Sequence, residues 1–151
     1  MSDIFVIMLV GHVLIGIVGL IASYAVLMGL LKKKLPLTFL RVSAIIAFLS
    51  YLSSWGMGGY YYVLRYGSEV KPIIKSGDYP WAHALFMEGK EHIFLFIPVL
   101  TFIIMILLWF LGDRIATEKR FRRPIILLAL LTTTLAIFIT AAGIVISGAA
   151  Q

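Results

Sequence analysis

The sequence predicts an all-α integral membrane protein, folded as a four-helix bundle with up-down-up-down topology. Hydrophobic residues make up 62% of the 151 residues and charged residues only 13%, with a mean hydropathy of +1.04. This composition is typical of membrane bundles rather than soluble domains. Charges are absent from four runs, at residues 4–31, 42–64, 93–112 and 124–151, each long enough for a span of ~20 residues. We expect a single transmembrane domain over residues 1–151.

The first predicted helix covers about residues 4–31. Asp3 precedes this apolar run and lysines follow it, so we expect a retained anchor rather than a cleaved signal peptide. The second predicted helix covers about residues 38–64 and ends among tyrosines, which favour the membrane–water boundary.

The third predicted helix covers about residues 81–112 and begins before the membrane does, because Pro80 is acceptable in a first helical turn. Pro98 lies inside this helix and is expected to bend it. The fourth predicted helix covers about residues 124–149. Short connections favour packing between helices that follow one another in the chain.

The basic residues predict the orientation. One side of the membrane receives nine of them, against four on the other side (Arg65, Lys71, Lys75 and Lys90). The positive-inside rule makes the nine-residue side cytoplasmic, so both termini are expected outside, in the periplasm of a prokaryote. The net charge of +6 is therefore an orientation signal, and no nucleic-acid partner is expected, since no nucleic-acid-binding motif accompanies it. The nine residues are Lys32, Lys33, Lys34, Arg41, Arg114, Lys119, Arg120, Arg122 and Arg123.

Histidines and glycines on three predicted helices fall at one depth. At ~1.5 Å per residue, His12, His92 and the pair Gly58 and Gly59 all lie roughly 27 to 30 Å from the cytoplasmic ends of their helices. Helices 1 and 3 lie diagonally across an up-down bundle, so His12 and His92 are expected to approach one iron from opposite sides. Imidazole is a common axial ligand of haem iron.

Glycine gives a flat cofactor room where two backbones come close. Gly16, Gly58 and Gly59 are therefore candidate haem-binding residues together with His12 and His92. The haem must be non-covalent and of b type, because the chain contains no cysteine for thioether attachment. Three histidines limit the site to one haem.

Structural interpretations stand beside these functional ones. Small residues at intervals of four also let membrane helices pack closely without a cofactor. His83 either contributes to the cofactor site, near propionates or a quinone, or lies on the wet surface. Lys90 is expected to form a solvated ion pair. His12, as a polar residue within a span, favours a ligand or proton-handling role.

A metal-binding membrane protein is a minor alternative. Glu88 and His92 lie four residues apart and share a helical face, and carboxylate and imidazole together bind zinc, iron or copper. With His12 and Glu91 they would form a small ligand set. Thiolate sites are excluded by the absence of cysteine.

The chain resembles the four-helix membrane b-type cytochromes of the cytochrome b561-like kind. The resemblance covers the four spans, His12 and His92, and the neighbouring glycines Gly11, Gly16, Gly58 and Gly59. It implies haem b, and electron relay between quinol and a periplasmic or membrane redox partner, with quinol oxidation as the associated activity. The chain departs from the family in having only three histidines, so a single haem near the outer leaflet is expected.

A different class of function stays open. The chain fits a non-catalytic accessory or scaffold subunit of a larger respiratory or photosynthetic membrane complex, since it has small loops and no extramembrane domain. A transporter is less favoured, because apart from His12 the spans carry no ionisable residues of the kind that mark conduction routes. In each case the protein is expected in the inner membrane of a prokaryote.

Overall fold

The computed structural model describes residues 3–150, which contain helices and no strand. Four helical units are long and apolar enough to cross a membrane: Asp3–Leu31, Leu37–Ser76, Ala82–Phe110 and Lys119–Ala149. The all-α class and the four candidate spans predicted from the sequence are confirmed. The first unit is the single helix α1 (Asp3–Leu31), within one residue of its predicted bounds.

The second unit is longer than predicted. Helix α2 (Leu37–Tyr61) continues without a break into a π-helix, η1 (Tyr62–Val70), and then into α3 (Lys71–Ser76). The expected end near residue 64 is therefore wrong, because Arg65 and the polar residues after it extend the helix beyond the apolar run. Pro72 follows the π-helical turns; it lacks the N–H that an α-helix would donate to the carbonyl of Ser68.

The third unit is interrupted one helical turn before Pro98. It begins with a second π-helix, η2 (Ala82–Met87), and continues as α4 (Glu88–Ile93) and α5 (Phe96–Phe110). Phe94 and Leu95 form a turn between α4 and α5, one helical turn before Pro98, because proline removes a backbone bond and crowds the carbonyl four residues earlier. In place of the predicted bend at Pro98, the structure has an interruption of the helix at Phe94 and Leu95.

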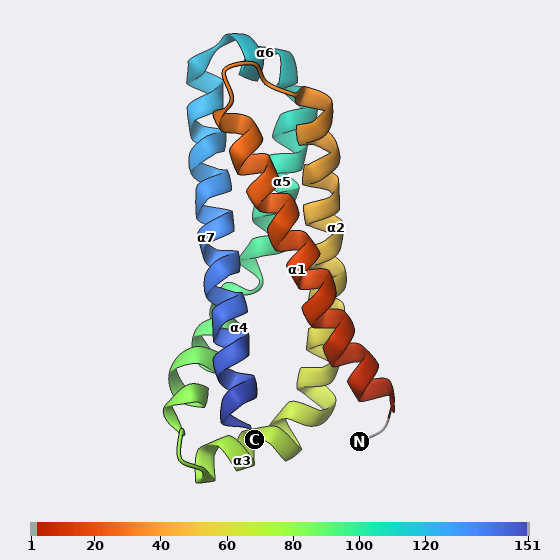
Figure 1. Ribbon diagram of the computed structural model, residues 1–151, viewed down its shortest axis with the longest axis vertical. Coiled ribbons are helices and arrows are strands. Elements are labelled where there is room, and N and C mark those ends of the chain that lie inside the picture. Colours follow the sequence, from red (N-terminus) through yellow and green to blue (C-terminus); the bar gives the residue numbers. More distant parts are fainter. Residues whose placement is uncertain (1–2, 151) are drawn as a thin grey trace.

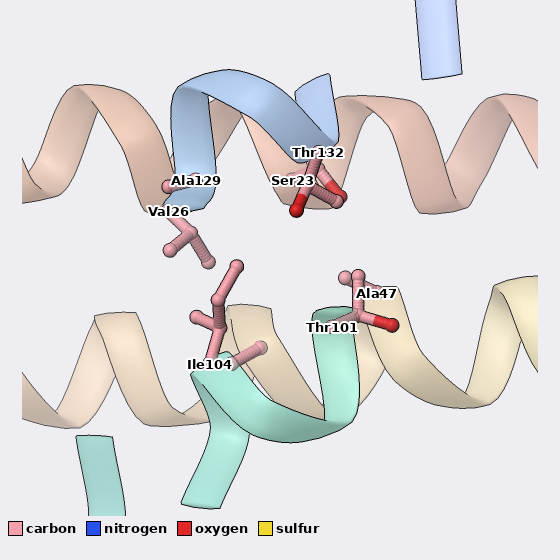
Figure 2. A pocket seen from close by; sticks show the side chains of 8 residues that line it. Ser23, Val26, Ala47, Thr101, Ile104, Ala129 and Thr132 are labelled. Carbon is pink, nitrogen blue, oxygen red and sulfur yellow. The ribbon is translucent and has the colours of Figure 1, made fainter. Parts of the chain in front are cut away.

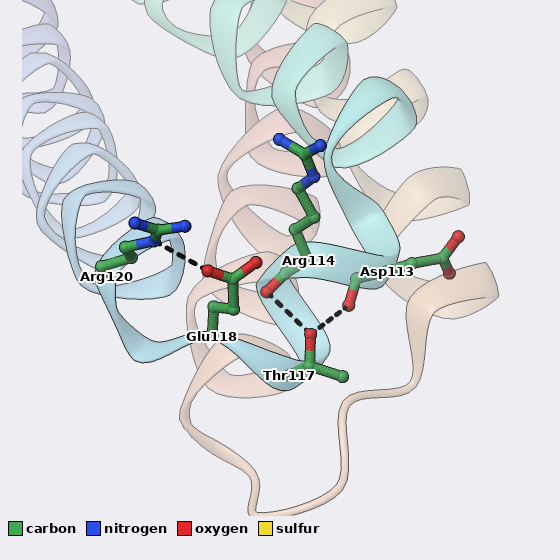
Figure 3. A network of polar contacts seen from close by, with 5 residues as sticks. All are labelled: Asp113, Arg114, Thr117, Glu118 and Arg120. Atoms are coloured by element: carbon green, nitrogen blue, oxygen red, sulfur yellow. Dashed lines mark hydrogen bonds and ion pairs between the residues drawn. The ribbon is translucent and has the colours of Figure 1, made fainter.

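A short helix, α6 (Gly112–Thr117), leads into α7 (Lys119–Ala149). Helix α7 begins five residues before Pro124, the predicted start. At the junction, the Thr117 hydroxyl donates to the carbonyl of Asp113 at 3.0 Å, and Arg120 pairs with Glu118 at 2.7 Å (Figure 3). The carboxylate of Glu118 precedes the first turn of α7, where negative charge stabilises a helix.

The spans pack as neighbours in chain order. Helix α1 contacts α2 and α7, and α5 also contacts α2 and α7, so α1 and α5 are the diagonal pair. Both termini lie at one end with α3, and α6 lies at the other end (Figure 1). We call the end that carries α3 the termini end. We call the end that carries α6 the basic end, because most lysines and arginines lie there.

Clusters of buried side chains follow one another along the bundle. Towards the basic end the core consists of large aliphatic side chains such as Leu30, Leu40 and Leu108, all fully buried. In the middle, alanines and Tyr51 replace them. A cavity of about 10 Å³ remains between the four spans, the space of one water molecule. It is lined by Ser23, Val26, Ala44, Ala47, Thr101, Ile104, Ala129 and Thr132, and Figure 2 shows these side chains converging from opposite helices.

Two arginines cap neighbouring helices at the basic end. Arg41, at the start of α2, donates from Nε to the carbonyl of Leu108 in α5 at 3.1 Å. Arg122, at the start of α7, donates to the carbonyls of Leu30 and Lys32, at the end of α1. The last carbonyls of a helix lack hydrogen-bond partners within the helix and carry partial negative charge. Each guanidinium supplies these carbonyls with both hydrogen-bond donors and a positive charge.

Candidate functional site

His12 is held against helix α2. Its Nδ1 lies 2.7 Å from the backbone carbonyl of Ser54, and the Ser54 hydroxyl donates to the carbonyl of His12 at 2.8 Å. A carbonyl oxygen only accepts hydrogen bonds, so Nδ1 of His12 carries the proton. The ring is therefore fixed in one tautomer, with Nε2 as a free acceptor.

Gly58 makes room for this imidazole. A side-chain carbon at Gly58 would lie 2.5 Å from Nδ1 and 2.7 Å from Cε1 of His12, whereas one at Gly59 would meet nothing within 4 Å. Gly16 makes similar room for Ser54, since a carbon there would lie 3.2 Å from the serine hydroxyl. These contacts support the packing interpretation of Gly16 and Gly58, because both glycines bring α1 and α2 together.

His92 lies on α4 with its side chain exposed. Its Nδ1 lies 2.6 Å from the carbonyl of Glu88, one turn earlier in the same helix. By the same reasoning Nδ1 is the donor and Nε2 is free. In both His12 and His92, therefore, Nδ1 donates to a backbone carbonyl. The carbonyl that accepts from His12 belongs to α2, whereas the one that accepts from His92 belongs to its own helix, α4.

Lys90 lies on α4 and reaches towards α7. Its Nζ would lie 3.7 Å from a side-chain carbon at Gly143 of α7. The side chain is half-buried, and within residues 3–150 the ion pairs are Arg65 with Glu69 and Arg120 with Glu118. The expected solvated ion pair of Lys90 is therefore not formed.

His83 belongs to a buried polar cluster. Its side chain is only 2% exposed, and its Nδ1 lies 2.9 Å from the hydroxyl of Tyr66, which is 3% exposed. Tyr62 stacks on Tyr66 and donates to Glu91 at 2.7 Å. The surface interpretation of His83 is wrong, because residues 62–91 fold over it at the termini end.

This cluster joins the two π-helical segments. Tyr62 and Tyr66 lie on η1, and His83 lies on η2. Single turns of π-helix occur frequently at functional sites, since the wider winding redirects side chains.

His12 and His92 are the two imidazoles that the sequence proposes as haem ligands. Two imidazole nitrogens on different helices are free to ligate iron, and each ring is oriented by a backbone carbonyl, as metal-bound histidines usually are. The metal alternative has weaker support, since no group of three or more histidine, aspartate or glutamate side chains among the described residues could hold a metal ion.

Sequence reasoning missed three contributors to this end of the protein. Ser54 gave no signal beyond its place in a small-residue pattern, and the tyrosines were expected only to anchor the boundary. Lys90 did give a signal: it is the basic residue nearest in sequence to His92, at the start of an apolar run.

Comparisons with protein family models, with curated proteins and with solved structures gave no significant match for this chain. The fold and the polar groups at the termini end therefore carry the functional argument.

Proposed function

We propose that this protein is a membrane cytochrome of b type that holds one non-covalent haem at the termini end. The observation that supports this most directly is the hydrogen bond that His12 and His92 each form through Nδ1. Each donates from Nδ1 to a backbone carbonyl, at 2.7 Å and 2.6 Å, which leaves Nε2 as the nitrogen that is available to a ligand. The two rings lie on α1 and α4, which belong to different spans.

In this proposal the chain's residues bind and orient the group. His12 and His92 would hold the haem iron, and Ser54 fixes the His12 ring. Lys90 offers its ammonium to a propionate carboxylate. When bound, the haem supplies reversible one-electron transfer, here between a quinol in the bilayer and a periplasmic or membrane redox partner. Glu88 is exposed at this end, and its carboxylate takes protons towards the aqueous phase.

We further propose that the four spans alternate across a prokaryotic inner membrane, with the basic end in the cytoplasm and both termini outside. The placement of the termini and α3 opposite α6 (Figure 1) supports this orientation, together with the excess of lysine and arginine at the basic end. Cytoplasmic connections are enriched in these residues. The haem site would then face the outer leaflet.

Single histidine variants test the ligand assignment. His12→Ala and His92→Ala should each abolish the b-type absorption bands of protein purified from haem-replete cells, while the protein remains monodisperse on size exclusion. His83→Gln is the matched control and should keep the bands, because His83 bonds Tyr66 within the buried cluster. Unchanged bands in both alanine variants would exclude the proposed ligand pair.

A second candidate, an accessory subunit of a larger membrane complex, is favoured by the packing of the core. Glycines on α1 receive side chains of α2: carbons added at Gly11 and Gly19 would lie 2.9 Å from Met57 and Tyr51. Such packing stabilises a helix pair without a cofactor. Haem-free protein that copurifies stably with other membrane subunits would favour this candidate.

A further inference from the structure

Exposed positive charge is concentrated at the basic end of the bundle. Of the nine lysines and arginines there, Arg41 and Arg122 are bonded to helix carbonyls, and the other seven side chains are exposed. The acidic residues of this end are Asp113 and Glu118, and Glu118 pairs with Arg120 at 2.7 Å. The surface therefore keeps a large excess of positive charge. The seven exposed residues, which we call the basic patch, are Lys32, Lys33, Lys34, Arg114, Lys119, Arg120 and Arg123.

Packing brings the segments that carry the basic patch together. Arg122, at the start of α7, donates to the carbonyl of Lys32, which ties the lysine run after α1 to the start of α7. The guanidinium carbons of Arg114 in α6 and Arg120 in α7 lie 5.9 Å and 4.9 Å from the centre of the Phe121 ring. Figure 3 shows both guanidiniums beside the turn that connects these helices. Three segments thus contribute cations to one surface.

The basic patch lies where the spans end. Helix α1 ends at Leu31 and α5 ends at Phe110. The exposed indole of Trp109 lies under the guanidinium of Arg41, whose central carbon is 5.3 Å from the ring centre. Tryptophan and arginine at the ends of membrane helices lie among lipid head groups. The neighbours of the basic patch in a bilayer are therefore the head groups of one leaflet.

We propose that the basic patch binds phospholipids whose head groups carry a net negative charge, such as phosphatidylglycerol. Clusters of about four to eight lysines and arginines beside a membrane span attract anionic lipids. The phosphate oxygens accept hydrogen bonds from guanidinium and ammonium groups, and the negative charge offsets the repulsion between the cations of the patch. A zwitterionic lipid offers the same phosphate, but its own ammonium group cancels the charge. This inference goes beyond the proposed function, because the basic patch lies at the end opposite the proposed haem site.

Native mass spectrometry of the full-length protein, purified in detergent, tests the basic patch. Phosphatidylglycerol and phosphatidylcholine with identical acyl chains are titrated separately, and the ratio of the two affinities is measured. Wild type should bind phosphatidylglycerol roughly tenfold or more tightly than phosphatidylcholine. Arg114→Gln combined with Lys119→Gln should lower this ratio by roughly fivefold or more. Arg114→Lys combined with Lys119→Arg keeps both charges and should retain the ratio.

Lys71→Gln combined with Lys75→Gln is the matched control, because it removes the same charge from α3 at the termini end. It should leave the ratio of affinities unchanged. Equal affinity of wild type for the two lipids would overturn the proposal, and this measurement needs no variant to fold. Equal losses in the two glutamine pairs would also overturn it, because they would assign the preference to the net charge of the whole chain rather than to the basic patch.

Discussion

At the scale of single residues, the contact between Gly58 and His12 determines how α1 meets α2. A methyl group at Gly58 would come within 2.5 Å of the imidazole, closer than van der Waals contact allows. The same ring is bonded to Ser54, so it has little freedom to move away. His12 is therefore part of the helix interface as well as a candidate ligand.

Gly58→Ala should destabilise the protein by about 1–3 kcal/mol, the usual cost of forcing extra volume into a packed interface. Gly59→Ala, one residue along the same helix, meets nothing within 4 Å and should be neutral or slightly stabilising, since alanine favours a helix by about 0.5–1 kcal/mol over glycine. Thermal unfolding in detergent measures both. Equal effects of the two substitutions would contradict the packing described for Gly58.

The hydrogen bond between Tyr66 and His83 is the other residue-scale feature of the termini end. Tyr66→Phe removes the hydroxyl that bonds the buried His83, which leaves a buried polar group unsatisfied and should cost about 1–3 kcal/mol. Tyr60→Phe is the control, because Tyr60 is 42% exposed, and it should change stability by no more than about 0.5 kcal/mol. The comparison is made by the same unfolding measurement.

At the scale of helices, the sequence predicted the spans well and their ends poorly. Uncharged runs marked the four spans, because a membrane helix excludes charge along its length. They did not mark the continuation of α2 through η1 to Ser76, since a helix that leaves the membrane accepts Arg65 and Glu69 freely. The break at Phe94 and Leu95 followed from Pro98, but the resulting placement of Lys90 depends on tertiary packing.

The arginine caps predict a local loss of helix stability. Arg122→Gln removes the donors to Leu30 and Lys32 and should cost about 1.5–3 kcal/mol, as hydrogen bonds from charged groups do. Amides in the last turn of α1 should exchange hydrogen faster. Arg123→Gln is matched in charge, and Arg123 is exposed, so it should leave this exchange unchanged. Faster exchange in both variants would point to lost charge rather than a lost cap.

At the scale of the whole molecule, the polar groups divide between the two ends. The basic end carries helix caps and exposed lysines, whereas the termini end gathers all three histidines, Lys90 and the bonded tyrosines. The sequence predicted that His12, His92 and Gly58 lie at one depth, and of these the structure brings Gly58 against His12. Helix position did not identify Ser54 as the hydrogen-bond partner of His12, because rotation about each helix axis decides which side chains meet.

The orientation is tested with single cysteines, since the natural chain has none. Ser68→Cys lies at the termini end and Ala116→Cys at the basic end, and both native residues are exposed. A membrane-impermeant maleimide should label the first in intact cells and the second only after lysis. The reverse pattern would place the termini in the cytoplasm.

The central claim is that this bundle binds haem through two imidazoles at the termini end. The most direct test is the reduced-minus-oxidised absorption spectrum of wild-type protein purified from haem-replete cells. The proposal predicts b-type bands that correspond to one haem per chain. A preparation that is folded and monodisperse but shows no such bands would contradict it.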